Sequence, residues 1–224
     1  MTGIVCVEIG VLADLCLRMI QTHAPGDVRG HEKEYSDVKE LEINKEVYTG
    51  MLIYCLGAGS YIEIFLKHWN WYGQLACGIF GAYLLVASIQ DLQSCQVYDF
   101  LHLLAAPVGL LVMLVPPTGP GEVVSLGSTQ QILSKLLSLL IFAGIQIGLF
   151  MRMYGAADGF VFMVCAVYES RFGEGLLTYL LHMGAAYLVL GVVQGFRRNI
   201  NSRGNLKKPV PFVPYIAATV WLFL

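Results

Sequence analysis

Long hydrophobic runs follow one another along almost the whole of this 224-residue chain. A helix that crosses a bilayer needs about 20 apolar residues, and a range of about 17–25 is usable. The sixth run and the last run are shorter than the others, and the first contains both acidic and basic residues. The pattern predicts an all-α polytopic transmembrane helix bundle of about eight spans, over residues 3–20, 49–66, 72–90, 100–116, 129–151, 156–170, 175–196 and 210–224.

The composition agrees with a membrane setting. Hydrophobic residues make up 56% of the chain and charged residues 13%, whereas a typical soluble domain is roughly 25% charged. The mean hydropathy is +0.63. The formal net charge is −2 and there is no basic stripe, so we expect no nucleic-acid partner. The expected surroundings are membrane lipid, in the cell (inner or plasma) membrane.

The basic residues predict an orientation for these spans. In an eight-span arrangement, all 14 Lys and Arg residues except Lys67, Lys135 and Arg171 fall on one side. Cytoplasmic loops carry an excess of Lys and Arg, so that side is predicted to be cytoplasmic. The polar segments 21–48 and 197–209 are then cytoplasmic loops, and both chain ends lie outside.

Two aspartates stand at the predicted cytoplasmic ends of hydrophobic spans. Asp91 closes the run AYLLVASIQD, and Asp158 closes the sequence Gly-Ala-Ala-Asp. A charge near hydrocarbon costs roughly 2.5–3.5 kcal/mol on insertion scales, so such an acid is a functional candidate by default. Two carboxylates brought close together cannot both ionise easily, and one then holds a proton, as an aspartyl protease requires. The sequence does not assign which aspartate is the acid and which the base.

Three short motifs accompany these acids. Asp99 stands eight residues after Asp91 across a short polar turn, Gly155–Asp158 reads Gly-Ala-Ala-Asp, and residues 211–214 read Pro-Phe-Val-Pro. In this order the motifs resemble the type IV prepilin peptidase family. That family consists of GxGD-type intramembrane aspartyl proteases and includes the archaeal preflagellin peptidases.

The resemblance implies a membrane aspartyl endopeptidase with Asp91 and Asp158 as catalytic acids. Its partners would be pilin-like precursors, each with a short basic leader that is removed from a hydrophobic helix at the cytoplasmic face. Gly155, Ala157 and Asp99 would support catalysis or substrate binding. No metal or cofactor is expected, and the oligomeric state stays open.

The resemblance also implies a division of the chain. Residues 71–224 would form the peptidase-like catalytic membrane domain, and residues 1–70 would contribute N-terminal spans with a short charged cytoplasmic loop. Larger members of the family carry a cysteine-bearing loop, associated with zinc and with N-methylation of the cleaved pilin. Residues 21–48 contain no cysteine and the chain has no C-x-x-C pair, so we expect cleavage without methylation.

Two positions depart from the family pattern. Phe160 stands where the family has Lys, two residues after the second aspartate, and Tyr98 stands where it has Pro. A catalytically weak or inactive membrane scaffold descended from the family is therefore an alternative. A small transporter is another, although a transporter holds its acids near mid-membrane on broken helices and these acids lie at helix ends.

Other polar residues in the spans have structural interpretations. Asp99 is expected to be the N-cap of the helix that follows it, because Asp is a favoured cap. Asp14 and Arg18 are four residues apart and are expected to pair on one helix face. His102 and His182 are expected to be hydrogen-bonded within the bundle rather than catalytic.

Overall fold

A computed structural model describes residues 2–23, 45–65, 71–115, 129–150, 155–171, 175–200 and 210–224. Within these ranges every regular element is a helix and no strand is present, which confirms the all-α prediction. The elements are α1 (Thr2–His23), α2 (Lys45–Phe65), α3 (Trp71–Ser94), α4 (Asp99–Leu114), α5 (Thr129–Ile145), the π-helical turn η1 (Gln146–Phe150), α7 (Ala156–Glu169), α8 (Leu176–Ile200), α9 (Val213–Thr219) and the 3₁₀ turn η2 (Val220–Leu222). Most of the two predicted cytoplasmic loops lies outside the described residues.

Three helices are long and apolar enough to cross a membrane. They cover Trp71–Ser94, Thr129–Leu149 and Leu176–Phe196. Shorter apolar helices cover Thr49–Ile62, Asp99–Leu114 and Val213–Leu222. Length and composition thus identify three spans, and the full count of eight stays a prediction.

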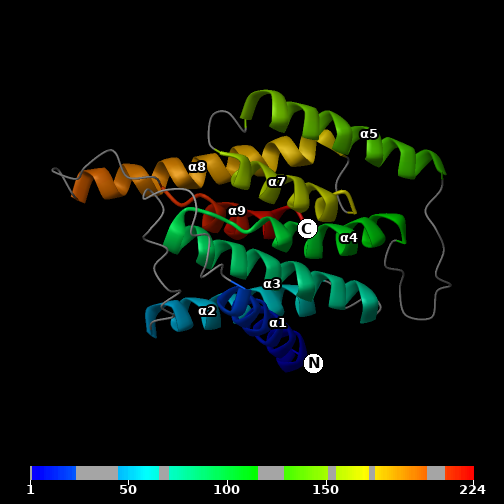
Figure 1. Ribbon diagram of the computed structural model, residues 1–224. Coiled ribbons are helices and arrows are strands. Elements are labelled where there is room, and N and C mark those ends of the chain that lie inside the picture. Colours follow the sequence, from blue (N-terminus) through cyan, green and yellow to red (C-terminus); the bar gives the residue numbers. More distant parts are fainter. Residues whose placement is uncertain are drawn as a thin grey trace.

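Helix α3 lies inside the bundle. It packs against α1, α2, α4 and α9, and every residue from Phe80 to Asp91 is buried. Figure 1 shows α1 and α2 on one side of it, and α7, α8 and α5 on the other, with the short α9 in the centre. The end of α3 and the starts of α7 and α9 lie at the same end of the bundle, at the left of Figure 1.

Glycines let α1 approach α3 closely. A Cβ at Gly78 would collide with the carboxyl group of Glu8, and a Cβ at Gly81 would lie 3.3 Å from Ile9 Cδ1. Small residues at such crossings allow backbones to approach in membrane bundles. The N-terminal helix α1 can therefore pack closely against α3 because these two positions have no side chain.

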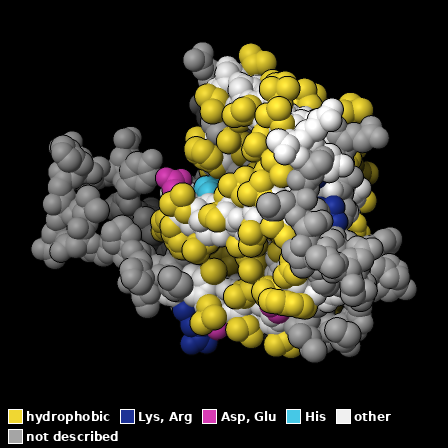
Figure 2. All heavy atoms as spheres, turned by 90° about the vertical axis from the view of Figure 1, so that its right-hand side faces the viewer, with side chains coloured by type: hydrophobic (Ala, Val, Ile, Leu, Met, Phe, Trp, Pro, Cys, Tyr) yellow, Lys and Arg dark blue, Asp and Glu magenta, His cyan; other side chains and the backbone are white. Residues whose placement is uncertain are grey.

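Apolar side chains cover much of the outer surface. On α5, Leu133 is 65% exposed and Leu140 is 69% exposed, and on α8, Leu188 is 67% exposed. Figure 2 shows hydrophobic side chains over most of the described part of one face. Soluble monomers rarely expose contiguous apolar patches of this extent, whereas a surface in contact with lipid does.

Candidate functional site

Asp91 lies in the last turns of α3 and is buried. The backbone N–H of Val213, at the start of α9, donates a hydrogen bond of 2.8 Å to Asp91 Oδ2. The backbone N–H of Phe212 is a second donor to the same carboxylate. The first N–H groups of a helix have no partner within the helix, so they are free to bind an acceptor. The Pro-Phe-Val-Pro segment thus holds Asp91 through its backbone.

Asp158 is placed by the glycine that precedes α7. Gly155 has φ 125° and ψ 154°, a combination that is essentially restricted to glycine. Asp158 follows in the first turn of α7, is half-buried, and has its Oδ2 3.7 Å from the point where a Cβ on Gly155 would lie. Ala157 packs against the hydrophobic core. The Gly-Ala-Ala-Asp motif therefore turns the chain into α7 and leaves the carboxyl partly open to water.

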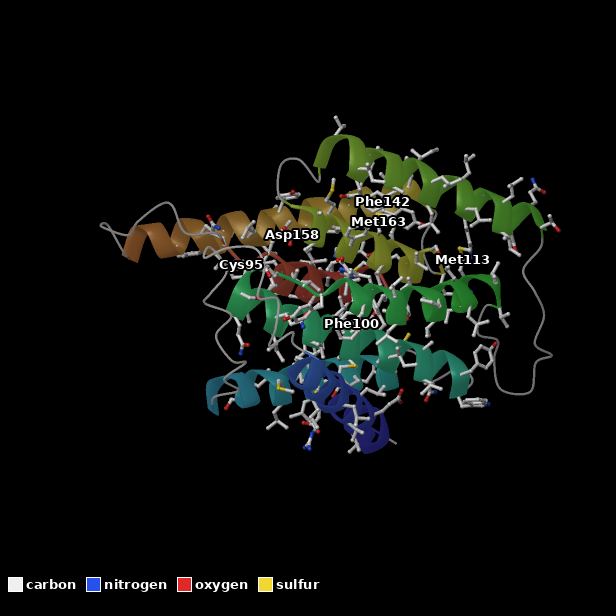
Figure 3. All side chains as sticks on the ribbon, viewed as in Figure 1. Cys95, Phe100, Met113, Phe142, Asp158 and Met163 are labelled. Carbon is white, nitrogen blue, oxygen red and sulfur yellow. The ribbon has the colours of Figure 1, made fainter. Side chains whose placement is uncertain are left out.

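The two aspartates lie near one another. Asp91 is close enough to Asp158 for the two carboxyl groups to interact electrostatically. Both carboxyl groups also interact electrostatically with Cys95, in the turn after α3. Burial first, and then these two charges, raise the pKa of the Cys95 thiol. Figure 3 shows Cys95 and Asp158 at the same end of the bundle. The fold thus brings together the two acids that the sequence singled out.

The turn after Asp91 has an unusual backbone. Cys95 has φ 53°, a left-handed conformation that glycine usually adopts at the end of a helix. Its N–H donates to the carbonyl of Asp91 at 2.8 Å, and the N–H of Tyr98 donates to Gln90 Oε1 at 3.2 Å. These bonds fix where α3 ends relative to the carboxyl of Asp91.

The N-cap prediction for Asp99 is wrong. Tyr98 occupies the cap position of α4, with no side-chain cap hydrogen bond, and Asp99 is the first helical residue. The bond from the Tyr98 N–H to Gln90 places the cap one residue earlier than expected. Asp99 is exposed, and its charge acts on His102. An acid in the first turn still interacts favourably with the helix dipole.

Phe160 packs toward α4. Its side chain is 40% exposed, and its ring centroid lies 5.6 Å from that of His102. His102 Nδ1 lies 2.9 Å from the hydroxyl of Tyr83, and His182 Nε2 lies 3.2 Å from the carbonyl oxygen of Ile216. Both histidines are therefore hydrogen-bonded in the interior, as predicted. The expected pair of Asp14 and Arg18 is also confirmed, at 2.7 Å.

Sequence reasoning missed two contributors to this region and one buried acid at the other end of α7. It had no signal for the amides of Phe212 and Val213 as partners of Asp91, although it singled out the motif. Tyr187 of α8 also escaped notice; its ring lies 4.8 Å from that of Phe212, and the charge of Asp158 acts on it. Glu169 could have been found, because an acid within an apolar run is a signal by itself.

The described residues contain no group of three or more His, Cys, Asp or Glu side chains that could hold a metal ion. No family model matches this chain, and neither a curated protein nor a solved structure matches it.

Proposed function

We propose that this protein is a membrane aspartyl endopeptidase of the prepilin peptidase kind, with Asp91 and Asp158 as its catalytic pair. The main support is that three motifs, far apart in the chain, meet at one end of the bundle. Asp91 accepts a bond from the N–H of Val213 at 2.8 Å, and its charge acts on Asp158. If two interfacial acids had met by chance, neither would be expected to accept a hydrogen bond from the third motif.

The hydrogen bonds suggest how the pair divides its work. Donors to a carboxylate favour its charged form, and Asp91 has two backbone donors. Asp91 is then the ionised base, which takes a proton from a water molecule between the two acids. Asp158 is the protonated partner, which donates a hydrogen bond to the scissile carbonyl and stabilises the developing oxyanion. The proton finally passes to the leaving amine.

The proposed substrates are pilin-like precursors with a short basic leader and a hydrophobic helix. In the proposed eight-span arrangement, the acids lie at the cytoplasmic face, where the leader meets the helix. Phe160 replaces a lysine of the family with an apolar ring, so leader recognition near Asp158 would depend less on charge. Cleavage would proceed without methylation of the product, because residues 21–48 have no cysteine.

A cleavage assay with purified protein and candidate precursors tests the proposal. Asn keeps the size of Asp but cannot serve as the acid or the base. Asp91→Asn and Asp158→Asn should each reduce cleavage by at least about 10⁴-fold, as the loss of catalytic groups that act as a unit does. Membrane levels of both variants should match wild type.

Asp14→Asn is the matched control, because Asp14 pairs with Arg18 on the surface of α1 and has no role at the proposed site. It should cleave at close to the wild-type rate. Full activity in either Asp91→Asn or Asp158→Asn would contradict the catalytic pair. A wild-type protein that cleaves no pilin-like precursor would favour the inactive scaffold instead.

A further inference from the structure

A second pair of ionisable groups lies in the bundle and is not used by the proposed reaction. Glu169 is the last residue of α7 and His182 lies in α8, and their exposed fractions are 0% and 1%. His182 Nδ1 lies 2.5 Å from Glu169 Oε1. Ionisable residues at such positions are expensive in a membrane and are functional candidates by default.

The hydrogen bonds of this pair fix its charge. Nε2 of His182 faces the carbonyl oxygen of Ile216 at 3.2 Å. A carbonyl oxygen only accepts, so Nε2 carries a proton. On the other side, one proton lies between Nδ1 and Glu169, either on the ring of a charged pair or on the carboxyl of a neutral pair. Both states are neutral overall, as burial requires.

The pair also joins the helix that carries Asp158 to the helix whose first amides bind Asp91. Glu169 belongs to α7, which carries Asp158 in its first turn, and Ile216 belongs to α9, whose first amides bind Asp91. The N–H of Ile216 donates to the carbonyl of Phe212 at 3.3 Å. A displacement of Ile216 therefore moves the donor amides as well.

Aromatic packing also connects α7, α8 and the start of α9. The ring of Phe162, one turn after Asp158, lies 5.5 Å from the ring of His182 and 5.7 Å from that of Phe212. Phe223 lies 5.5 Å from His182. Cys165 of α7 and Tyr179 of α8 are the neighbouring groups on which the charge of Glu169 acts. His182 thus lies at the junction of α7, α8 and α9.

We propose that Glu169 and His182 form a positioning pair that holds α7 against α9 and so sets the placement of Asp158 relative to Asp91. The inference rests on the proposed function, and it names two residues that touch neither the substrate nor the reacting atoms. A misplacement of about 1 Å far from the chemistry can reduce a rate about 10²-fold.

The decisive variant replaces the pair by apolar side chains, as Glu169→Leu combined with His182→Phe. Such replacements of buried ion pairs are often neutral or stabilising, so this double variant should fold. It loses the bond to Ile216, however, and kcat for a cleaved precursor should fall about 10- to 100-fold with KM little changed. Glu169→Gln should keep most of the activity, because its amide can still donate to Nδ1.

Tyr168→Phe is the matched control. Tyr168 precedes Glu169 on α7, is buried, and donates to the carbonyl of Ala105 on α4 at 3.1 Å. The Tyr168→Phe variant loses one buried hydrogen bond between α7 and α4, and this bond does not involve α9. Wild-type kcat in the Leu/Phe double variant, or an equal loss of kcat in Tyr168→Phe, would overturn the proposal.

A second measurement needs no substrate, so it separates this inference from the proposed function. Alkylation of Cys95, followed by mass spectrometry of its peptide, reports on the charges of both aspartates near it. If the aspartates move apart, Asp158 loses the shared proton and the negative charge near Cys95 increases. Near pH 6, Cys95 should then react at least about 3-fold more slowly in the double variant, which corresponds to half a pKa unit. An unchanged rate in a folded double variant would overturn the positioning role, even if no precursor is cleaved by the wild type.

Discussion

At the scale of single residues, Asp91 and Asp158 differ in how they are held. Asp91 is 5% exposed and its carboxylate is bound by backbone amides of another element. Asp158 is more exposed, and its position depends on the backbone that leads into its own helix. Substitutions beside the two acids should therefore act in different ways.

Gly155 is the residue on which the placement of Asp158 depends. Its φ of 125° is strained for any side chain, so Gly155→Ala should cost about 1–3 kcal/mol of stability. The alternative is a shift of the first turn of α7, which would displace Asp158. We expect lower thermal stability in detergent together with a loss of cleavage.

Gly184→Ala provides the control for this prediction. Gly184 lies within α8, and a Cβ there would meet nothing within 4 Å. Alanine in a helix interior is favoured over glycine by roughly 0.5–1 kcal/mol, so this variant should be as stable as wild type or more so. If Gly155→Ala behaves like Gly184→Ala, the special backbone at Gly155 has no role.

At the scale of helices, the hydrophobic runs were enough to predict where helices form. The run predicted over 72–90 is α3 at Trp71–Ser94, and the run over 175–196 is α8 at Leu176–Ile200. Apolar length specifies such helices locally. The last run was predicted over 210–224; α9 begins only at Val213, because prolines stand just before and at its start, and the 3₁₀ turn η2 continues it to Leu222.

The partners of the acids could not be predicted in the same way. The bond from Val213 to Asp91 joins residues 122 positions apart, and it forms only because α9 packs between α3 and α8. The Glu169–His182 pair likewise depends on the packing of α7 against α8. Periodicity and motif spacing describe one segment at a time, so they identify the acids but not what holds them.

The relation between α3 and α7 gives a prediction about charge. If Asp91 and Asp158 share one proton, the pair carries a single negative charge, and either single Asn variant carries the same charge. Each negative charge near Cys95 raises the pKa of its thiol and slows alkylation at a fixed pH. Each single variant should therefore alkylate at Cys95 at nearly the wild-type rate near pH 6, and the Asp91→Asn, Asp158→Asn double variant should react faster.

Independent acids would give another pattern. With two full charges in the wild type, each single variant would already speed the alkylation of Cys95, and the double variant would add the two effects. Site-resolved mass spectrometry of Cys95 distinguishes the two patterns without any substrate. An additive series would contradict the shared proton and the mechanism built on it.

At the scale of the whole molecule, the two candidate acids lie at helix ends on the same side of the bundle. Figure 1 shows the end of α3 and the starts of α7 and α9 at one end of the bundle, and Asp91 and Asp158 lie there. The predicted cytoplasmic loops 21–48 and 197–209 also connect helices at that end in an eight-span arrangement. The acids should therefore face the cytoplasm, where the basic leader of a precursor would be found.

Labelling in intact cells tests this orientation. A cysteine introduced as Ser202→Cys should be protected from an impermeant thiol reagent until the cells are broken, because Lys and Arg are retained on the cytoplasmic side. A cysteine introduced as Thr118→Cys, after α4, should react in intact cells, and the native cysteines provide the background in each case. Reaction at position 202 with protection at position 118 would invert the orientation. The acids would then face away from the compartment in which precursors are made, and the leader-peptidase proposal would fail with the topology.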